Sequence, residues 1–329
     1  MSLVAPTLEA FFTLRLRAQK NASPHTVVSY RDCWRLLLRY VQETTGKAPS
    51  ELCFDDLDAP VVGAFLDHLE VDRATSVASR NVRLAALRSF FHFAGLRHPE
   101  HAAVVTRVLA IPAKRADRAL VSFLTPPEVD ALLASPDLTS WTGRRDHALL
   151  VVAVQTGLRV SELTALPRCD LNLGTGAYVH CTGKGRKDRD TPLTRKSIAV
   201  LRAFVAERDD GPCSALFPGP RGEPLSRDAV RKLLTRHASN AATRCPSLRT
   251  KSVHPHVLRH TCAMRLLEAG LDLATIALYL GHEDTRTTMR YLHAYLALKE
   301  RAIARTAPPN TAPGRFRPPD PLLQFLDRL

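Results

Sequence analysis

The stretch Thr156-Gly157-Leu158-Arg159-Val160-Ser161-Glu162-Leu163 follows a nearly all-apolar segment, residues 145–155, with helical periodicity. A helix that is apolar on all sides is buried, so this segment is expected at the centre of a core. Gly157 breaks the helix, and Arg159 therefore emerges on a turn whose place the core determines. We expect this turn to hold a functional arginine.

The last third of the chain carries a second group of polar residues. It contains His254-Pro255-His256-Val257-Leu258-Arg259-His260-Thr261, then Leu280-Gly281-His282, then Tyr291. Arginine offers a permanent planar cation that binds phosphate oxygens in pairs, a tyrosine hydroxyl can attack phosphorus, and a histidine can hold or move the proton. Together with Arg159, these residue types indicate phosphate chemistry at a site that requires no metal ion or other cofactor.

In order and spacing, these motifs resemble those of the tyrosine recombinases, the phage integrase family, and of its Xer-like members in particular. The family pattern has an arginine in a T-G-L-R-x-S-E-L turn, a lysine in a β-hairpin, an H-x-x-R pair, a histidine after L-G and a tyrosine nine positions on. The matching residues here are Arg159, Lys184, His256, Arg259, His282 and Tyr291. The resemblance implies a site-specific DNA recombinase, or integrase, that cuts and rejoins strands through a 3′-phosphotyrosyl intermediate without metal or ATP.

The resemblance also implies a role for each residue. Tyr291 is the nucleophile, while Arg159 and Arg259 neutralise the charge that builds on the phosphoryl oxygens in the transition state. The leaving 5′-oxygen needs a proton, and the family pattern G-K-G assigns this general-acid role to Lys184 in its glycine-flanked turn. Lys187, three residues further on, is the alternative.

The histidines are expected to divide into active and structural ones. His256 and Arg259 lie three residues apart and share a helix face, so His256 is expected to assist the tyrosine proton. His282 is expected to bond a non-bridging oxygen. His260 is expected to be structural or to support the catalytic residues, because its position directly after Arg259 turns it away from that face.

The nucleophile has a rival within one helical turn. Tyr295 lies four residues after Tyr291 and projects from the same side of a predicted helix, residues 285–305. The spacing from His282 favours Tyr291. Glu162, by resemblance, orients the residues around Arg159.

The charge balance favours a polyanionic partner. Lys and Arg total 46 against 32 Asp and Glu, which gives a net charge of +14 and a pI of about 9.9. Such an excess is expected of a protein that binds double-stranded DNA. The 7 cysteines are scattered without a C-x-x-C pair, which favours reduced thiols over a zinc site. The longest apolar run, residues 148–154, is too short to span a membrane, and we expect a cytoplasmic protein.

A length of 329 residues indicates two domains. We expect a mainly α fold with a small antiparallel β-sheet, and the resemblance names the parts. They are an N-terminal helical core-binding, SAM-like domain (residues 1–97), a basic interdomain linker (98–122), a catalytic domain (123–306), and a Pro-rich tether with a C-terminal apolar helix (307–329).

The N-terminal domain is expected to hold about four helices, one of which begins at Ser23-Pro24 and ends at Gly46. A later helix, residues 77–93, carries arginines on a face suited to DNA phosphates or simply to solvent. The basic linker would let the two domains close around a duplex, as the resemblance implies. The candidate DNA contacts outside the active site are Arg80, Arg83, Arg88, Lys114, Arg115 and Lys187.

The catalytic domain begins with a clear helix start, in which Thr125 caps the helix and Glu128 follows three residues later. Residues 171–193 are rich in strand formers and glycine turns, which predicts three short antiparallel strands. Further helices are expected at residues 197–207, 227–238, 256–269, 274–280 and 285–305.

Two other functions fit parts of the pattern. A type IB topoisomerase shares the tyrosine chemistry without exchanging partners, and a catalytically silent DNA-binding regulator would share the fold alone. The separate N-terminal bundle and the tethered tail favour recombination. The resemblance implies a homo-oligomer on DNA, a tetramer in the synapse, in which the C-terminal helix docks on a neighbouring protomer or on its own domain.

Overall fold

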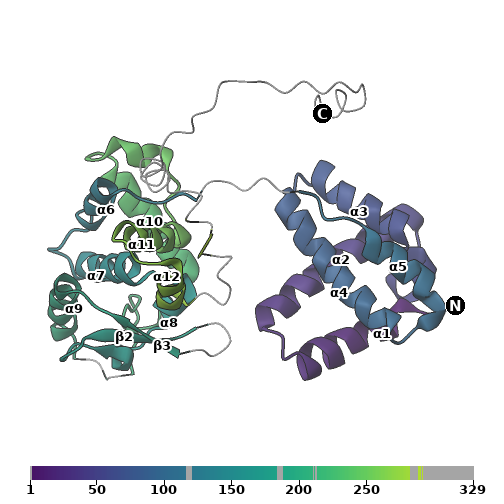
Figure 1. Ribbon diagram of the computed structural model, residues 1–329, viewed down its shortest axis with the longest axis horizontal. Helices are drawn as coiled ribbons and strands as arrows, with labels where there is room; N and C mark the ends of the chain where they lie inside the picture. Colours follow the sequence, from purple (N-terminus) through teal and green to yellow (C-terminus); the bar gives the residue numbers. More distant parts are fainter. Residues whose placement is uncertain are drawn as a thin grey trace, which may run out of the picture. The chain divides into compact units, whose positions relative to one another are not determined.

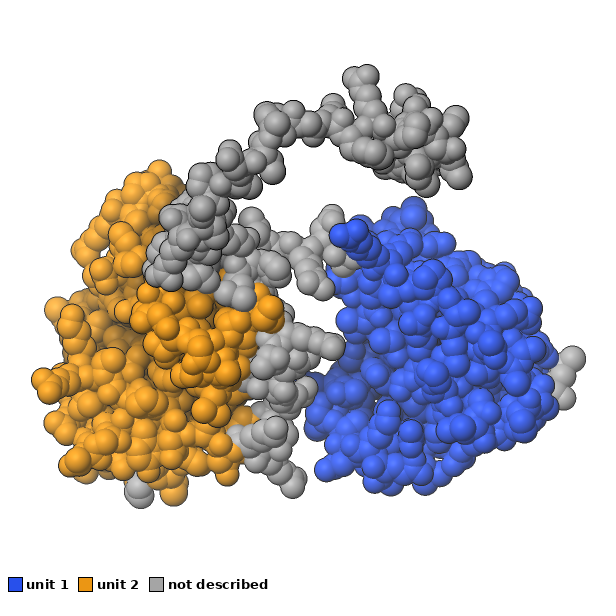
Figure 2. All heavy atoms as spheres, in the orientation of Figure 1, with its two compact units in different colours: residues 1–118 blue, residues 119–329 orange. Residues whose placement is uncertain are grey.

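The computed structural model describes residues 2–115, 121–183, 188–209, 211, 213–281, 288, 289 and 291. It divides into two compact units, Met1–Arg118 and Ala119–Leu329, which Figure 2 colours separately. Each unit has its own apolar core. The two-domain prediction from chain length therefore agrees with the structure.

The regular elements described in the N-terminal unit are helices, apart from an isolated β-bridge between Leu3 and Cys53. Its elements are α1 (Val4–Ala10), the π-helical segment η1 (Phe11–Gln19), α2 (Pro24–Thr45), the short 3₁₀ turns η2 (Pro49–Glu51) and η3 (Phe54–Leu57), α3 (Ala59–Val71), α4 (Val77–Gly95), the 3₁₀ turn η4 (Pro99–His101) and α5 (Ala102–Ala110). Helix α2 begins and ends as expected. The Ser23 side chain accepts a hydrogen bond from the Thr26 N–H, and Gly46 takes the left-handed conformation, φ 73°, that ends the helix.

Helix α5 corrects the expected linker. Residues 102–110 form a helix that packs against α4, with Val105 and Val108 buried in the N-terminal core. The prolines at 99 and 112 suggested an exposed connection. Between them, however, the apolar residues Val104, Val105 and Val108 return at helical spacing, and this short stripe is enough to bury the segment.

The C-terminal unit combines helices with one small sheet (Figure 1). Its elements are α6 (Pro126–Leu133), α7 (Trp141–Thr156), α8 (Val160–Ala165), the 3₁₀ turn η5 (Arg168–Asp170), β1 (Leu171–Asn172), β2 (Tyr178–Thr182), β3 (Asp188–Pro192), α9 (Arg195–Ala206), α10 (Arg227–Ala241), the 3₁₀ turn η6 (Pro246–Thr250), α11 (Pro255–Glu268) and α12 (Leu273–Leu280). The expected capping interaction is present, since the Thr125 N–H donates to Glu128 Oε2 at 2.8 Å.

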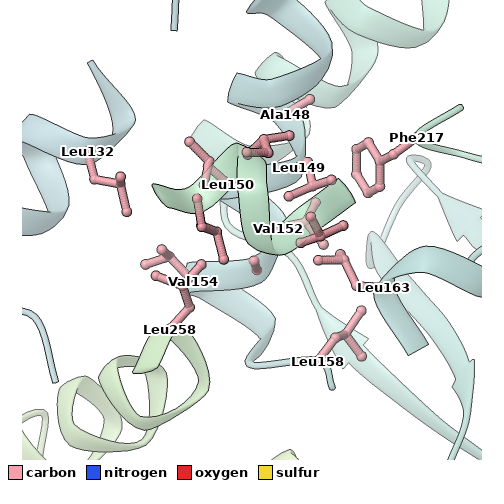
Figure 3. Close-up of a cluster of buried hydrophobic side chains, with 14 of the residues drawn as sticks. Leu132, Ala148, Leu149, Leu150, Val152, Val154, Leu158, Leu163, Phe217 and Leu258 are labelled. Carbon is pink, nitrogen blue, oxygen red and sulfur yellow. The ribbon is translucent and has the colours of Figure 1, made fainter. Parts of the chain in front are cut away.

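Helix α7 forms the centre of this unit, as its apolar sequence predicts. It packs against α6, α9 and α11. Figure 3 shows Leu149, Leu150 and Val152 of α7 in the core, and Leu158 and Leu258 belong to the same cluster. These two leucines directly precede Arg159 and Arg259, so the core holds the chain on which both arginines stand.

The strands pair antiparallel in the order β1-β2-β3. Val179 lies opposite Thr191, and Cys181 lies opposite Arg189. The mainly α fold with a small antiparallel sheet is therefore confirmed. Of the expected helix 285–305, the structure describes only Thr288, Met289 and Tyr291, which are helical, and the tail at 307–329 lies outside the described residues. None of the described helices is both long and apolar enough for a membrane span.

A buried charge cluster joins α7 to α10. Asp146 is 0% exposed and accepts hydrogen bonds from Arg145 Nη2 and Arg236 Nη2, each at 2.7 Å, while His237 Nε2 lies 3.0 Å away. Burial alone would raise the pKa of Asp146. The hydrogen bonds and positive charge of His237 and Arg145 outweigh this effect and hold the pKa below its ordinary value. The charged carboxylate therefore stabilises the fold.

We expect Asp146→Asn to lower the free energy of unfolding at pH 7 by about 3–5 kcal/mol, because it leaves the buried guanidinium of Arg145 without its counter-charge. A depressed carboxylate pKa stabilises the fold above the unfolded-state pKa, and this contribution disappears as the pH falls through the folded-state pKa. The difference between the wild type and the variant in urea unfolding should thus shrink below about pH 4. Asp228→Asn, which removes an exposed pair with Arg231 on α10, is the control and should change little.

Candidate active site

The turn after α7 is shaped by close packing. Gly157 ends the helix with φ +60°. A Cβ at this position would lie 2.6 Å from Leu280 Cδ2 and 3.1 Å from Cys262 Cβ. Only glycine fits both the conformation and the space, so the end of α7 can lie directly against α11 and the end of α12. Figure 1 shows these helices together in the C-terminal unit.

This packing gives both arginines carbonyl partners at helix ends. Arg259 donates from Nη1 to the Gly157 carbonyl at 2.7 Å and from Nη2 to the Leu280 carbonyl at 2.5 Å. Arg159 donates from Nη2 to the Gly281 carbonyl at 2.8 Å. The last carbonyls of a helix have no partner within the helix and carry partial negative charge. The C-terminal ends of α7 and α12 therefore fix the two guanidinium groups beside one another.

Glu162 holds the site from the first turn of α8, where its side chain is buried. Its Oε2 accepts from the Arg159 backbone N–H at 2.8 Å, and its Oε1 accepts from Arg159 Nη1 at 2.8 Å. Burial alone would raise the pKa of Glu162, but hydrogen bonds and charge from Arg189 and Arg159 keep it below the ordinary value. Glu162 thus orients Arg159, as the resemblance implied.

Arg189 is a third arginine in the site and was not predicted. It projects from β3 and donates from Nη2 to Glu162 Oε2 at 2.7 Å. A sequence signal existed, because strand residues alternate between faces and Arg189 shares its face with the buried Thr191. A charged residue on the inward face of a strand needs a partner, which here is Glu162.

The guanidinium groups repel one another in this enclosed space. The pKa of Arg259 is lowered to about 10, first by burial and then by the positive charges of Arg159 and Arg189. Arg259 remains charged at neutral pH. An anion placed between these groups would relieve the repulsion, and a phosphate has the right charge and geometry.

Tyr291 is packed against α11 and α12, and its side chain is 1% exposed. Its Oη lies 3.0 Å from His260 Nδ1. His260, predicted to be structural or to support the catalytic residues, therefore contacts the candidate nucleophile itself. His260 is one turn after His256 on α11, and its ring lies against that of Tyr291. The i+4 spacing from His256 was the signal that would have found it.

Of the remaining predicted residues, the structure describes only His256. His256 is exposed in the first turn of α11, and its ring centroid lies 6.2 Å from that of His254. Lys184, Lys187, His282 and Tyr295 lie outside the described residues. The structure therefore brings together Arg159, Arg259 and Tyr291 from the predicted set, and adds Arg189 and His260.

A cleft of about 410 Å³ opens beside Arg159 and the first turn of α8. Arg159 and Glu162 line one part of it, and Pro167, Asp170 and Thr182 line another. The Arg159 side chain is 26% exposed, so part of its guanidinium faces solvent here. In the described part of the chain, no group of three or more His, Cys, Asp or Glu side chains is placed to hold a metal ion.

The arginines of α4, which were predicted to contact DNA, bind backbone carbonyls of their own unit. Arg80 is 4% exposed and donates to the Pro112 carbonyl at 3.1 Å, so its assignment as a surface DNA contact is wrong. Arg88 donates to the Ile111 carbonyl, and Arg83 donates to the Ser29 carbonyl at 3.1 Å. Both are half-buried. These arginines hold the backbone of their own unit together.

Lys114 and Arg115, the two DNA contacts predicted in the linker, have different surroundings. Lys114 Nζ lies 2.5 Å from Glu70 Oε2 and 3.4 Å from Asp67 Oδ1, both on α3. Arg115 is exposed. Lys114 is thus engaged by carboxylates of the N-terminal unit, whereas Arg115 presents its side chain to solvent.

Comparison with known sequences and structures gives a consistent result. The sequence model of the phage integrase family matches residues 122–297, and that of the phage integrase N-terminal SAM-like domain matches residues 10–98. The chain is 54% identical over 326 residues to a Sinorhizobium fredii protein named as integrase/recombinase y4rC, covering 99% of this chain and 98% of that protein. It is 32% identical to tyrosine recombinase XerC of Pelobacter propionicus, covering 87% of this chain and 90% of that protein.

Among solved structures, the XerH site-specific recombinase bound to palindromic difH substrate in a post-cleavage complex has the same fold. The TM-score is 0.68 at 24% sequence identity, and the match covers 86% of this chain and 80% of that one.

Proposed function

This chain belongs to the phage integrase family of tyrosine recombinases, enzymes that cleave and rejoin DNA, and from that membership we propose how its own residues perform the reaction. Tyr291 attacks a phosphodiester of double-stranded DNA, while Arg159 and Arg259 bind the non-bridging oxygens. The observation that carries this assignment is the convergence of both guanidinium groups at the ends of α7 and α12, beside the helix of Tyr291.

The covalent step exchanges one ester for another. The Tyr291 oxygen forms a bond to phosphorus, and the bond from phosphorus to the 5′-oxygen breaks. This leaves a 3′-phosphotyrosyl ester and a 5′-hydroxyl, which attacks the ester of a partner strand and releases Tyr291. Because one phosphoester replaces another, the step needs no ATP.

Two protons have to move in this step. The Tyr291 hydroxyl loses one, and His260 lies within hydrogen-bond distance of that hydroxyl. His256, one turn earlier on the same face of α11, is proposed to assist. The leaving 5′-oxygen gains the other proton from Lys184, with Lys187 as the alternative donor. His282 is proposed to bond a non-bridging oxygen.

Suicide substrates test this proposal directly. Nicked duplexes carrying candidate sites from the DNA that flanks the gene are incubated with the protein, and denaturing gels reveal any covalent adduct. Strand exchange between two duplexes, as opposed to relaxation of supercoils or binding alone, identifies a recombinase. Failure to form an adduct on any flanking sequence would contradict the proposal.

The N-terminal unit supplies a second proposed DNA surface. Arg31, Arg35 and Arg39 are exposed on α2 and recur every four residues, so they form one ridge. Only Arg31 is paired with a neighbouring carboxylate, that of Asp32, among the described ion pairs on this ridge. We propose that this ridge contacts DNA phosphates, together with the exposed Arg115.

Arg35→Ala/Arg39→Ala should weaken DNA binding equally for all sequences, because phosphate contacts carry no base information. Each lost contact should reduce the log-log salt slope of the affinity by about 0.9. Fluorescence anisotropy at several salt concentrations measures both effects. Arg107→Ala, which removes an exposed arginine from α5 of the same unit, is the matched control. The control removes one charge and the test variant two, so an equal loss per removed charge would show that overall charge, and not the ridge, determines binding.

We also propose that the protein acts as a homo-oligomer on DNA, a tetramer in the synapse. The sequence of the tail supports this, since a proline-rich tether precedes the apolar residues Leu322, Leu323, Phe325 and Leu326. Such a segment can reach a neighbouring protomer.

Arg83, Arg88 and Lys187 remain proposed DNA contacts.

A further inference from the structure

The carboxylate of Glu162 is shared between two arginines. Its Oε1 lies 2.8 Å from Arg159 Nη1 and 3.3 Å from Arg189 Nη1, and its Oε2 lies 2.7 Å from Arg189 Nη2. Arg189 therefore binds this carboxylate through both terminal nitrogens. Arg159 approaches the same group with one side-chain nitrogen and keeps its other terminal nitrogen on the Gly281 carbonyl.

Arg189 is also held tightly by its surroundings. Its side chain is only 12% exposed, and it extends from the strand position opposite Cys181. At Gly281, an added Cβ would lie 2.6 Å from Arg189 Nη1, so the guanidinium passes directly over this glycine. The Nε of Arg189 is buried and has no hydrogen-bond partner within the described structure. Arg189 thus connects β3, the start of α8 and the end of α12.

The charges explain what this connection does. Glu162 and Arg159 alone would form a neutral pair, and the carboxylate would compete with a phosphate for the Arg159 guanidinium. With Arg189 present, two guanidinium groups share one carboxylate, so the three side chains together keep one positive charge. The guanidinium group that faces the cleft can present this charge to a phosphate. Arg159 is that group, since it is more exposed than Arg189 and lines the cleft.

We propose that Arg189 is a positioning residue for strand cleavage, which neutralises Glu162 so that Arg159 keeps its charge and orientation for the scissile phosphate. This inference rests on the proposed function, because it assigns Arg189 to the same site. Arg189 acts through Glu162 and Arg159 and does not itself touch the DNA. It differs in this respect from Arg159 and Arg259.

The test compares Arg189→Met, Glu162→Gln and the double variant in single-turnover cleavage of a nicked suicide substrate at saturating protein. Arg189→Met should lower the cleavage rate about tenfold to a hundredfold, a coupling typical of residues in one ionic network. DNA affinity should change less than about twofold, since the residue makes no DNA contact. The double variant should cleave at least about fivefold faster than Arg189→Met, because the single amide oxygen introduced by Glu162→Gln can still accept from Arg159 Nη1 but carries no charge that neutralises it.

Two further variants separate this role from a general effect on the fold. Arg189→Lys keeps a positive charge beside Glu162 and should cleave faster than Arg189→Met, and it also serves if Arg189→Met does not fold. Asp190→Asn removes an exposed partner of His180 from the adjacent position of β3, which faces the other side of the sheet. This control should cleave like the wild type.

The outcomes are distinct. A double variant no faster than Arg189→Met overturns the proposal, since Arg189 would then contact the phosphate itself or serve only the fold. If the wild type forms no adduct, the proposed function fails instead. The charge-sharing inference is then judged by thermal unfolding: a higher melting temperature for the double variant than for Arg189→Met supports it, and an equal or lower one overturns it.

Discussion

Tyr291→Phe will form no covalent adduct with DNA, and its cleavage rate will fall by at least about four orders of magnitude, the scale seen when a covalent nucleophile is removed elsewhere. Phenylalanine keeps the ring that packs against α11 and α12, so the fold and the DNA affinity should persist. The loss of the hydrogen bond to His260 should cost only about 1 kcal/mol of stability. Denaturing gels with a nicked suicide substrate measure the adduct.

Two other tyrosines serve as controls. Tyr295→Phe tests the rival predicted from the helix spacing, and Tyr279→Phe removes a hydroxyl that donates to the Gln155 carbonyl. Both should form the adduct. An adduct that persists in Tyr291→Phe but disappears in Tyr295→Phe would move the nucleophile by one helical turn.

Arg259→Lys will lower the cleavage rate about 10²- to 10³-fold, the cost of removing one preorganised donor from a developing negative charge. The positive charge is kept, but a lysine cannot bridge the Gly157 and Leu280 carbonyls while it also faces a phosphate. Because the pKa of Arg259, although lowered, is still about 10, the wild-type group stays charged through neutral pH. Single-turnover rates at saturating DNA separate this effect from binding.

The matched control is Arg265→Lys, an exposed arginine on the same helix. It should leave the cleavage rate unchanged. A rate for Arg259→Lys within about threefold of the wild type would show that charge alone is sufficient at this position, against the preorganised-donor argument.

The parts of the fold that local chemistry determines could be read from the sequence. The buried helix α7, the cap at Thr125 and the three strands within residues 171–193 each depend on residues close in the chain. Helix α5 was missed because flanking prolines and a basic cluster suggest a linker, while its apolar stripe is only two turns long. Short amphipathic segments acquire their structure from tertiary packing.

In the candidate site, too, the residues in local motifs could be predicted, but their distant partners could not. Arg159 and Arg259 carry motifs that could be recognised, and the structure brings them together. The partners of Arg80 and Arg189 could not be inferred, because an arginine in the sequence shows its charge but not what it binds. Arg80 binds Pro112, 32 positions away, and Arg189 binds Glu162, 27 positions away. Contacts of this kind exist only after the elements have packed.

The covered position of Tyr291 has a consequence for fidelity. With 1% of the side chain accessible, a phosphate can meet its oxygen only after the surrounding helices yield. The free energy for that displacement has to come from contacts with the duplex. On the proposed function, a stretch of DNA held loosely by the proposed ridge leaves the hydroxyl shielded, and the rest of the genome is thereby protected from stray nicks.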